Sequence, residues 1–317
     1  MHSLKQRLKR KLTNSPIWID RPYTVQLDTI RDCNLSCVHC NVKKGGSFNF
    51  QGGLMDTKIF LQVMNYWKEN LNGEKFGCVA PWMNGEPLLL KNLGDYVNWS
   101  KEFCNSKTVL DTNGTLYENR FKLLNSNIRL VRFTINSYNT ETYEAIHGKD
   151  LLLEALDTLS FFKAFKFENQ KIAINHIVNK YNIDEVDDFK RSFNGFDINI
   201  FPVHSGIYQI DSQENKTDQI KEFTRISENG EVSYPNRIKE KSMKYPCQCW
   251  DIMPIGIKGE IMQCVDYPPD INYGNVMKDD LLTAWKERNK NKMDNDYCNS
   301  CGLRFKNWRE VMDKWVK

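Results

Sequence analysis

The chain has 317 residues and a formal net charge of +4. With 40% hydrophobic and 26% charged residues, the composition is that of a globular protein and excludes a disordered or fibrous chain. No apolar run is long enough to cross a membrane and no secretion signal is visible, so we expect a cytoplasmic protein without membrane or nucleic-acid partners. Without a route to an oxidising compartment, the 10 cysteines indicate metal or redox chemistry rather than disulfides.

The chain begins with a basic extension, residues 1–22, in which Met1–Leu12 has leucines at helical spacing. Over residues 23–205, short strand-like runs alternate with longer helical patterns. The predicted strands are Thr24–Ile30, Phe76–Trp82, Thr108–Asp111, Val131–Asn136, Ile172–Val178 and Ile198–Val203. The predicted helices are Asp56–Asn70, Leu93–Cys104, Tyr117–Asn125, Leu151–Phe165 and Asp184–Phe193. This alternation predicts an α/β fold with a parallel sheet and helices outside, most simply a barrel or partial barrel.

The composition changes after residue 205. Residues 206–245 are polar and charged, above all Ser212–Lys241, and we interpret them as a linker or bridging region. Residues 246–317 hold half of the cysteines, with Gly and Pro turns between short strands, and end in a helical pattern at Gly302–Lys317. We therefore predict a second, small α+β domain organised around metal.

Three cysteines, Cys33, Cys37 and Cys40, follow the first predicted strand within eight residues. Three thiolates on one loop can converge on one metal centre, and the spacing leaves its fourth position without a nearby protein ligand. A structural zinc site needs four protein ligands, whereas an open position marks a reactive centre. Soft thiolates also suit an iron–sulfur cluster with one iron left open.

These cysteines match the CX3CX2C signature of the radical S-adenosylmethionine (radical SAM) superfamily, placed as in that family after strand one. Further resemblances follow in the family's order. The segment Asn84-Gly85-Glu86-Pro87 resembles the Gly-Gly-Glu-Pro motif, with Asn84 replacing the first glycine. The third predicted strand is followed by Thr112-Asn113-Gly114. The fourth strand carries Phe133-Thr134-Ile135-Asn136-Ser137, which resembles the family's Ser-Ile-Asp-Gly segment. The sequence is thus identified as a member of this superfamily.

The resemblance implies a partial (βα)6 TIM-like barrel. It also implies a reduced 4Fe–4S cluster on the three cysteines that cleaves S-adenosylmethionine to methionine and a 5′-deoxyadenosyl radical. The residues expected to contact this cofactor are His39, Asn84, Gly85, Glu86, Asn113, Thr134 and Asn136. Thr134 and Asn136 share one face of a strand, which leaves Phe133 and Ile135 for the helices outside. Two alternatives stay open: Asn113 as a left-handed turn residue and Glu86 as a capping carboxylate.

A second cysteine group lies in residues 246–317, and it resembles the C-terminal auxiliary-cluster domains called SPASM and Twitch, in the shorter Twitch form. The simplest set of four ligands for one auxiliary iron–sulfur cluster is Cys249, Cys264, Cys298 and Cys301. Cys247 is a fifth candidate, a substitute for Cys249, or a thiol beside the site. The alternative is zinc, since separated cysteine pairs also form zinc ribbons.

Several further side chains are candidate functional residues, each with an ordinary structural role as the alternative. Cys78 and Cys247 are catalytic candidates as hydrogen-atom donors, although an inert buried cysteine is the commoner case for Cys78. The remaining candidates are Cys104 as a packed thiol, Gln26 and Asp28 facing the lumen, His176 and His204 in the core or the site, and His147, which stands where relatives often have Arg. That departure puts in doubt any cofactor contact that the arginine makes in relatives.

The expected reaction is hydrogen abstraction from an unactivated carbon, leading to oxidation or epimerisation. Because only residues 1–22 precede the first strand, we expect a small polar metabolite, sugar-like or aminocyclitol-like, as the substrate. The alternative is a peptide, as for a RiPP maturase or a sulfatase maturase; a zinc-stabilised binding protein is a remote third reading. A reductant such as flavodoxin or ferredoxin is the expected partner.

Overall fold

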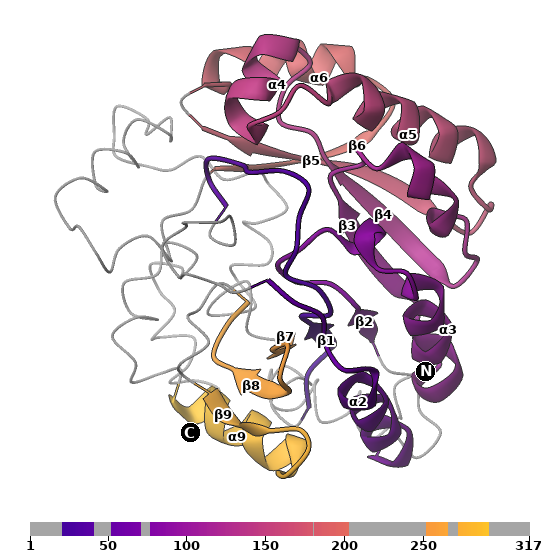
Figure 1. Cartoon of the computed structure of the whole chain (residues 1–317), viewed down its shortest axis with the longest axis vertical. Helices are drawn as coiled ribbons and strands as arrows, with labels where there is room; N and C mark the ends of the chain where they lie inside the picture. The colour runs from indigo at the N-terminus through magenta and orange to yellow at the C-terminus, as the bar shows by residue number, and fades with distance from the viewer. Residues whose placement is uncertain are drawn as a thin grey trace, which may run out of the picture.

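Figure 1 shows the computed structural model of the chain. The structure describes residues 21–40, 52–70, 77–179, 181–202, 252–265 and 272–291. The strands of these segments form one sheet in the order β6-β5-β4-β3-β2-β1-β7-β8-β9. Strands β1 to β6 pair in parallel, each with the next along the chain. The fold is therefore the expected α/β architecture, with a mostly parallel sheet consistent with a partial TIM barrel.

All six strands expected in the core are present, with some shifts at their ends. They are β1 (Thr24–Leu27), β2 (Cys78–Ala80), β3 (Thr108–Thr112), β4 (Ile128–Thr134), β5 (Lys171–Val178) and β6 (Asp197–Pro202). β1 ends before the predicted Ile30 because the backbone turns at Leu27, whose carbonyl accepts a hydrogen bond from the Thr29 amide. Ile30 instead forms an isolated bridge with Leu54.

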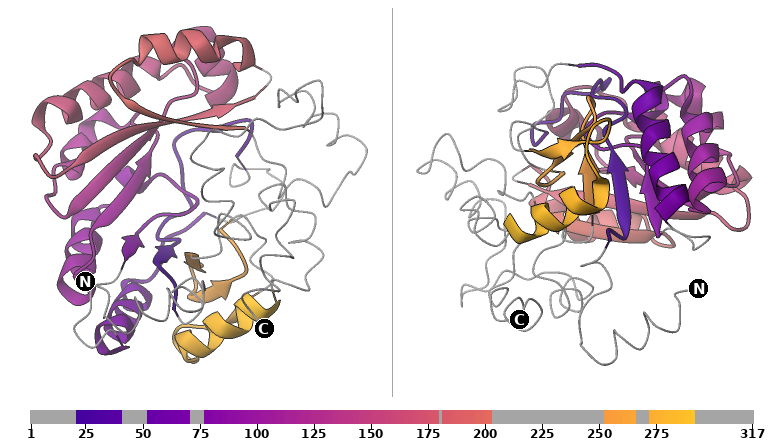
Figure 2. Two further views of the ribbon diagram at one scale, coloured as in Figure 1. Left: turned by 180° about the vertical axis from the view of Figure 1, so that it is seen from behind. Right: turned by 90° about the horizontal axis from the view of Figure 1, so that it is seen from below.

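The helices of the core lie along the outer side of the curved sheet (Figures 1 and 2). They are α2 (Thr57–Asn70), α3 (Leu93–Cys104), α4 (Thr140–His147), α5 (Leu152–Phe165) and α6 (Val186–Ser192). α2 buries Phe60, Val63, Met64 and Trp67, whose spacing of three or four residues places them on one face. Ile59 and Tyr66 flank this face and are half-buried against the core, as the amphipathic pattern predicts.

Two segments differ from the prediction. Residues Tyr117–Leu123 form a 3-10 helix instead of the expected α-helix. The helix α4, which is only eight residues long, was not predicted from the sequence pattern. Its boundaries nevertheless have a local cause: the Asn139 side chain accepts a hydrogen bond from the Thr142 amide at 3.1 Å, and Gly148 ends the helix with a φ of 76°.

The C-terminal segment joins the sheet of the core. It comprises β7 (Ile252–Ile255), β8 (Glu260–Met262), β9 (Asn272–Asn275) and α9 (Leu281–Asn291). β7 pairs in parallel with β1, and β8 and β9 continue from it in antiparallel fashion (Figure 1). The first strand of the predicted second domain therefore extends the barrel sheet. The predicted helices at Met1–Leu12 and Gly302–Lys317 and the linker at 206–245 lie outside the described residues.

The core lies between the sheet and the helices. Phe133 of β4 is fully buried, packs 6.0 Å from Phe162 of α5 between ring centroids, and has Gly114 against its ring. Gly114 has a φ of 73°, and a Cβ there would lie 3.0 Å from Phe133 Cδ1. Within the described segments, no helix has the length and apolar character needed to span a membrane.

Candidate active site

The polar residues expected in the site converge at one edge of the sheet, where the parallel strands end. The loop after β1 carries Cys33, the loop after β2 carries Glu86, and the loop after β3 carries Asn113. Asn136 follows β4. Because parallel strands present their carboxyl ends at the same edge, four loops meet here, as in the active sites of β/α barrels.

The cysteine loop is held against α4 by its backbone. The Ser36 amide donates to the His147 carbonyl at 3.1 Å, and the Val38 amide donates to the Ile146 carbonyl at 2.9 Å. The Cys40 amide turns back to the Cys37 carbonyl at 3.1 Å. The C-terminal end of α4, the helix that the pattern analysis missed, therefore supports the loop that carries the three thiols.

The Cys33 thiol lies among hydrogen-bond donors. The Leu35 amide lies 3.5 Å from its Sγ, and the Asn113 Nδ2 lies 3.7 Å away. Partial desolvation by the surrounding loops raises the pKa of Cys33 to about 11, although part of the residue is exposed, and Glu86 and Cys40 raise this pKa further. A bound metal deprotonates such a thiol outright, and the N–H donors then face a thiolate.

The donor chemistry of this loop fits an iron–sulfur cluster: it carries three thiols, of which Cys33 lies beside the Asn113 amide NH2 and Cys37 beside the His147 ring nitrogen Nδ1. In the part of the chain that the structure describes, no three His, Cys, Asp or Glu side chains are grouped so as to hold one metal ion. The assignment of a cluster to Cys33, Cys37 and Cys40 thus depends on the chemistry of the thiols and on the family.

Glu86 is almost fully buried, and its side chain binds the end of β3, the loop after it and the 3-10 helix that follows Glu86. Its Oε1 accepts hydrogen bonds from Thr112 Oγ1 at 2.7 Å and from the Leu88 amide at 3.0 Å, and its Oε2 accepts one from the Asn113 amide at 2.8 Å. Burial raises the pKa of Glu86 to about 7, while these hydrogen bonds oppose the rise. Glu86 is thus the capping carboxylate of the alternative reading, and its Oε2 keeps capacity for a further donor.

Gly85 is needed for a close approach of backbone to backbone. A Cβ at this position would lie 2.4 Å from the Ile30 carbonyl oxygen and 2.7 Å from that of Asp32. The next residue, Glu86, donates its amide to the same Asp32 carbonyl at 2.9 Å. The first requirement for glycine is therefore the packing of the β2 loop on the cysteine loop, rather than the approach of a cofactor that its sequence context suggested.

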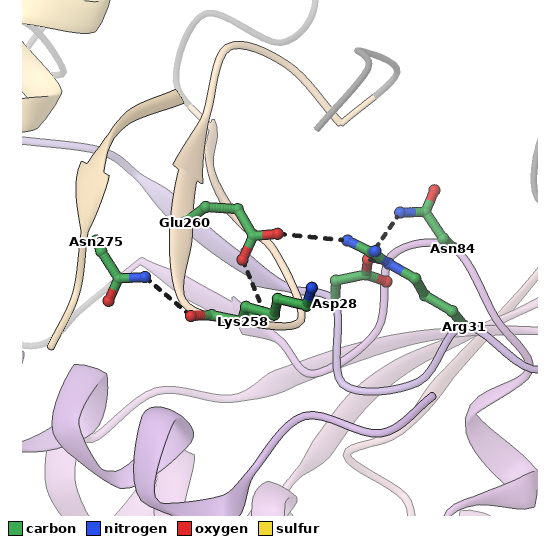
Figure 3. A network of polar contacts seen from close by, with 6 residues as sticks. All are labelled: Asp28, Arg31, Asn84, Lys258, Glu260 and Asn275. Carbon is green, nitrogen blue, oxygen red and sulfur yellow. Dashed lines mark hydrogen bonds and ion pairs between the residues drawn. The ribbon is translucent and has the colours of Figure 1, made fainter. Parts of the chain in front are cut away.

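A buried polar network links these loops to the C-terminal hairpin (Figure 3). Asp28 Oδ2 accepts hydrogen bonds from Arg31 Nε at 2.5 Å and Asn84 Nδ2 at 3.1 Å, and Arg31 Nη2 lies 3.8 Å from Glu260 Oε1 of β8. Burial raises the pKa of Asp28, and the Arg31 charge opposes this. Its Oδ1 is buried and accepts no hydrogen bond from the described residues. Asp28 therefore offers one unused acceptor at the base of the site.

His147 bridges the cysteine loop and β4. Its Nδ1 lies 3.1 Å from Cys37 Sγ, and its Nε2 lies 3.3 Å from Asn136 Nδ2. Burial lowers the pKa of His147 to about 3. Tyr143 stacks on the ring at 4.1 Å between centroids. His147 thus contacts a predicted cluster ligand, Cys37.

The other predicted cofactor residues lie in different surroundings. The polar side chains of Asn113 and Asn136 already bond within the protein: Asn113 Oδ1 accepts from Thr115, and Asn136 Oδ1 accepts from the Ile177 amide. The left-handed position after β3 is Gly114, so Asn113 is not the turn residue of the alternative reading. His39 and Thr134 are half-buried, and no described contact tests their roles.

A row of polar side chains that was not predicted from the sequence lies on the inner face of the sheet. Arg132 of β4 pairs with Asp111 of β3, whose Oδ2 accepts a hydrogen bond from Asn175 of β5 at 3.2 Å. Asn175 Oδ1 in turn accepts one from Asn199 of β6 at 3.1 Å, and Arg132 lies 5.7 Å from the ring centroid of Trp82. The available signal was a polar residue at alternate positions of otherwise apolar strands.

Other candidates lie apart from this edge. Cys78 begins β2, beside Thr24, at the opposite end of the strand from Glu86. Cys104 is buried beside Met64 of α2, and His176 packs on the Phe189 ring of α6. Cys264 is half-buried just after β8. The remaining candidates, which are His204, Cys247, Cys249, Cys298 and Cys301, lie outside the described residues.

The family model for the radical SAM superfamily matches residues 27–193, more than half of the chain. The chain therefore belongs to the radical SAM superfamily, and the carboxyl-edge loops just described lie within the matched residues. The match runs from the end of β1 to α6 and includes the three cysteines and Glu86. It ends before β7, so the predicted auxiliary-cluster domain lies beyond it.

The individual relatives share 25% sequence identity or less with this chain. The chain is 25% identical to mycofactocin maturase MftC of Mycolicibacterium smegmatis over 179 residues, which are 54% of this chain but only 41% of that protein. The structure of Streptococcus suis SuiB bound to precursor peptide SuiA aligns with a TM-score of 0.63 at 19% identity, covering 94% of this chain and 73% of SuiB. Native anSMEcpe with AdoMet and the Cp18Cys peptide aligns with a TM-score of 0.65 at 14% identity, covering 92% and 94%. These alignments establish a shared fold.

Proposed function

We propose that this radical SAM enzyme modifies a peptide substrate. The observation that carries the proposal is the 25% identity over 179 residues to MftC, a maturase. SuiB and anSMEcpe, two structural relatives, have been crystallised with peptides. These findings favour the peptide alternative over the small polar metabolite that we expected first.

The cofactors of the proposal are a 4Fe–4S cluster on Cys33, Cys37 and Cys40 and S-adenosylmethionine. When bound, they supply the radical chemistry that abstracts a hydrogen atom from an unactivated carbon. Two acceptor atoms at the carboxyl edge have capacity for the amino group of S-adenosylmethionine. Oε2 of Glu86 receives one hydrogen bond and Oδ1 of Asp28 receives none from the described residues. The other proposed contacts come from His39, Asn84, Gly85, Asn113, Thr134 and Asn136.

The inner face of the sheet suits a peptide chain. Asp111, Arg132, Asn175 and Asn199 present carboxylate, guanidinium and amide groups side by side, and Trp82 adds an aromatic surface. Peptide backbones need both donors and acceptors, and this row supplies both. The Arg132 and Asp111 side chains are 30% and 18% exposed, so both remain within reach of a ligand.

The test is to reconstitute the protein anaerobically with iron and sulfide, reduce it, and supply S-adenosylmethionine with short peptides encoded beside its gene. We expect 5′-deoxyadenosine together with a modified peptide. A Cys33→Ala variant is the matched control and should give neither product. Turnover of an aminocyclitol but of no peptide would contradict the proposal that the substrate is a peptide. Two bound zinc atoms without iron would contradict the proposed iron–sulfur enzyme.

The same experiment separates the reaction types. Dehydrogenation or cross-linking removes two hydrogen atoms from the peptide, with the second electron passing to an auxiliary cluster. Epimerisation keeps the mass in water but adds deuterium from heavy water, with Cys78 or Cys247 as the hydrogen donor. Replacing each of these two thiols by Ala tests the donor role. If both variants still form the modified peptide, neither Cys78 nor Cys247 is the hydrogen donor.

The auxiliary cluster is a separate part of the proposal. Its ligands would be Cys249, Cys264, Cys298 and Cys301, and Cys264 lies close behind the strand that carries Glu260. We expect the iron and acid-labile sulfide content of the reconstituted protein to fall by about half in a Cys264→Ala variant, as expected when one of two like clusters is lost. Unchanged iron content would contradict a cluster at this position. Flavodoxin or ferredoxin is the proposed reductant.

A further inference from the structure

Between the cysteine loop and β4, one histidine connects a proposed cluster ligand to the sheet. His147 is 1% exposed, with Nδ1 at 3.1 Å from Cys37 Sγ and Nε2 at 3.3 Å from Asn136 Nδ2. This contact joins residues 110 positions apart in the chain. No sequence motif predicted it.

The hydrogen bonds of Asn136 determine which ring nitrogen of His147 carries the proton. Asn136 Oδ1 accepts a hydrogen bond from the Ile177 amide at 2.7 Å, so the Nδ2 donor of Asn136 must be the group that faces His147. Nε2 of the ring is then an acceptor. In a neutral imidazole the other nitrogen carries the proton, so Nδ1–H points at the Cys37 sulfur.

The ring cannot turn away from this arrangement easily. Tyr143, one turn earlier in α4, stacks on it at an angle of 26°. The His147 carbonyl accepts the Ser36 amide at 3.1 Å, so backbone and ring of the same residue both hold the cysteine loop. Gly148 follows with a φ of 76°, and a Cβ there would lie 3.3 Å from the Ser36 carbonyl oxygen. Helix and loop are thus closely fitted around His147.

We propose that His147 is a positioning residue that donates its Nδ1–H to the Cys37 thiolate and thereby raises the reduction potential of the cluster bound by that thiolate. The inference rests on the proposed function, because it requires the cluster on Cys33, Cys37 and Cys40. The physical reason is electrostatic. A hydrogen bond to a ligand sulfur stabilises the more negative, reduced cluster, and such bonds are among the factors that set cluster potentials.

The test compares two variants in the reconstituted full-length protein. His147→Phe removes the donor but keeps a flat ring for Tyr143, and His147→Asn places an amide N–H near the position of Nδ1. We expect the midpoint potential, followed by electron paramagnetic resonance without S-adenosylmethionine, to fall in His147→Phe and to return toward the wild-type value in His147→Asn. An unchanged potential in His147→Phe at full iron content would overturn the proposal.

A second measurement does not depend on either variant assembling its cluster. In wild-type protein labelled with 15N-histidine, the reduced cluster should show a 15N coupling and a coupled exchangeable proton that disappears in heavy water. Because His39 precedes Cys40, a His39→Asn variant is the matched control and should keep the signal. If the His39→Asn control lacks the 15N coupling, the coupling comes from His39 and not from His147, and the proposed hydrogen bond is wrong. Failure of the wild type to bind iron would instead overturn the proposed function.

Discussion

The two faces of the sheet from β3 to β6 differ in composition and in role. On the face toward the helices, Leu110, Val131, Phe133 and Ile174 are all fully buried. On the inner face, the neighbouring positions on the same strands carry Asp111, Arg132, Asn175 and Asn199, joined by hydrogen bonds. Strands of a parallel sheet covered on both faces are usually apolar throughout.

Within a single strand, the outer side chains therefore stabilise the fold, and the inner side chains are the ones available for function. The outer side chains contribute by burial, at about 25 cal/mol per Å² of apolar surface. The inner side chains are polar and paired with one another, and the Asp111–Arg132 pair is partly exposed, so this pair adds little to stability and remains available to a ligand. If this division holds, substitutions on the two faces must have different consequences.

The largest loss of stability is expected on the outer face. Phe133→Ala removes a fully buried ring that packs on Phe162 and against Gly114. Phe→Ala substitutions in cores cost about 3–5 kcal/mol, so the free energy of unfolding should fall by that amount. Denaturation in urea, monitored by circular dichroism, measures it. A loss below about 1 kcal/mol would show that the helix-facing layer is loosely packed.

The next effect is expected at the carboxyl edge. Glu86→Gln replaces a carboxylate that accepts three hydrogen bonds by an amide whose NH2 faces a donor, which should cost about 1–3 kcal/mol. Burial raises the pKa of Glu86 from 4.5 to about 7, so the folded state binds more protons between these values. The stability of the wild type therefore falls as the pH rises from 4.5 to 7, by at most about 1.4 kcal/mol per unit.

Glu86→Gln should lack this contribution, so the difference between wild type and variant should shrink as the pH rises through that window. Urea denaturation at several pH values measures the difference, which cancels the titration of all other groups. A difference that stays constant across the window would contradict the raised pKa.

A buried base on the outer face should have the opposite pH dependence. His176 packs on Phe189, and burial lowers its pKa from 6.5 to about 4. The unfolded state then binds more protons between pH 4 and 6.5, so this group makes stability rise with pH across that window. His176→Phe should lose that slope and differ little from the wild type at pH 7, where both states hold a neutral ring. Thermal unfolding at pH 5 and pH 7 tests the sign.

The smallest effect on stability is expected on the inner face. The double variant Asp111→Asn with Arg132→Gln removes a pair that is partly exposed, and its stability should stay within about 1 kcal/mol of the wild type. Under the proposed function the same variant should raise the KM for the peptide. A loss as large as that of Phe133→Ala would remove the distinction between the two faces. Arg191→Gln, on the exposed Arg191–Asp188 pair of α6, is a control for loss of a surface ion pair.

Much of the fold was predictable because local periodicity decides it. The ends of α3 agree with the predicted Leu93–Cys104, and the six core strands lie where apolar runs placed them. The alternation on β4 correctly sent Phe133 and Ile135 to the buried side. The short helix α4 was missed because eight residues give too little periodicity, although its Asn139 cap and Gly148 end are visible in the sequence.

The sequence by itself determined the family, the three cysteines and the order of the loops that meet at the carboxyl edge, since motif residues are adjacent along the chain. Tertiary structure alone decided how they are held. It placed β7 beside β1, connected Glu260 to Arg31, gave Gly85 its contact with the Ile30 carbonyl, and set His147 against Cys37. These contacts join residues distant in sequence, and their partners are selected by strand order and close packing, which no local pattern records.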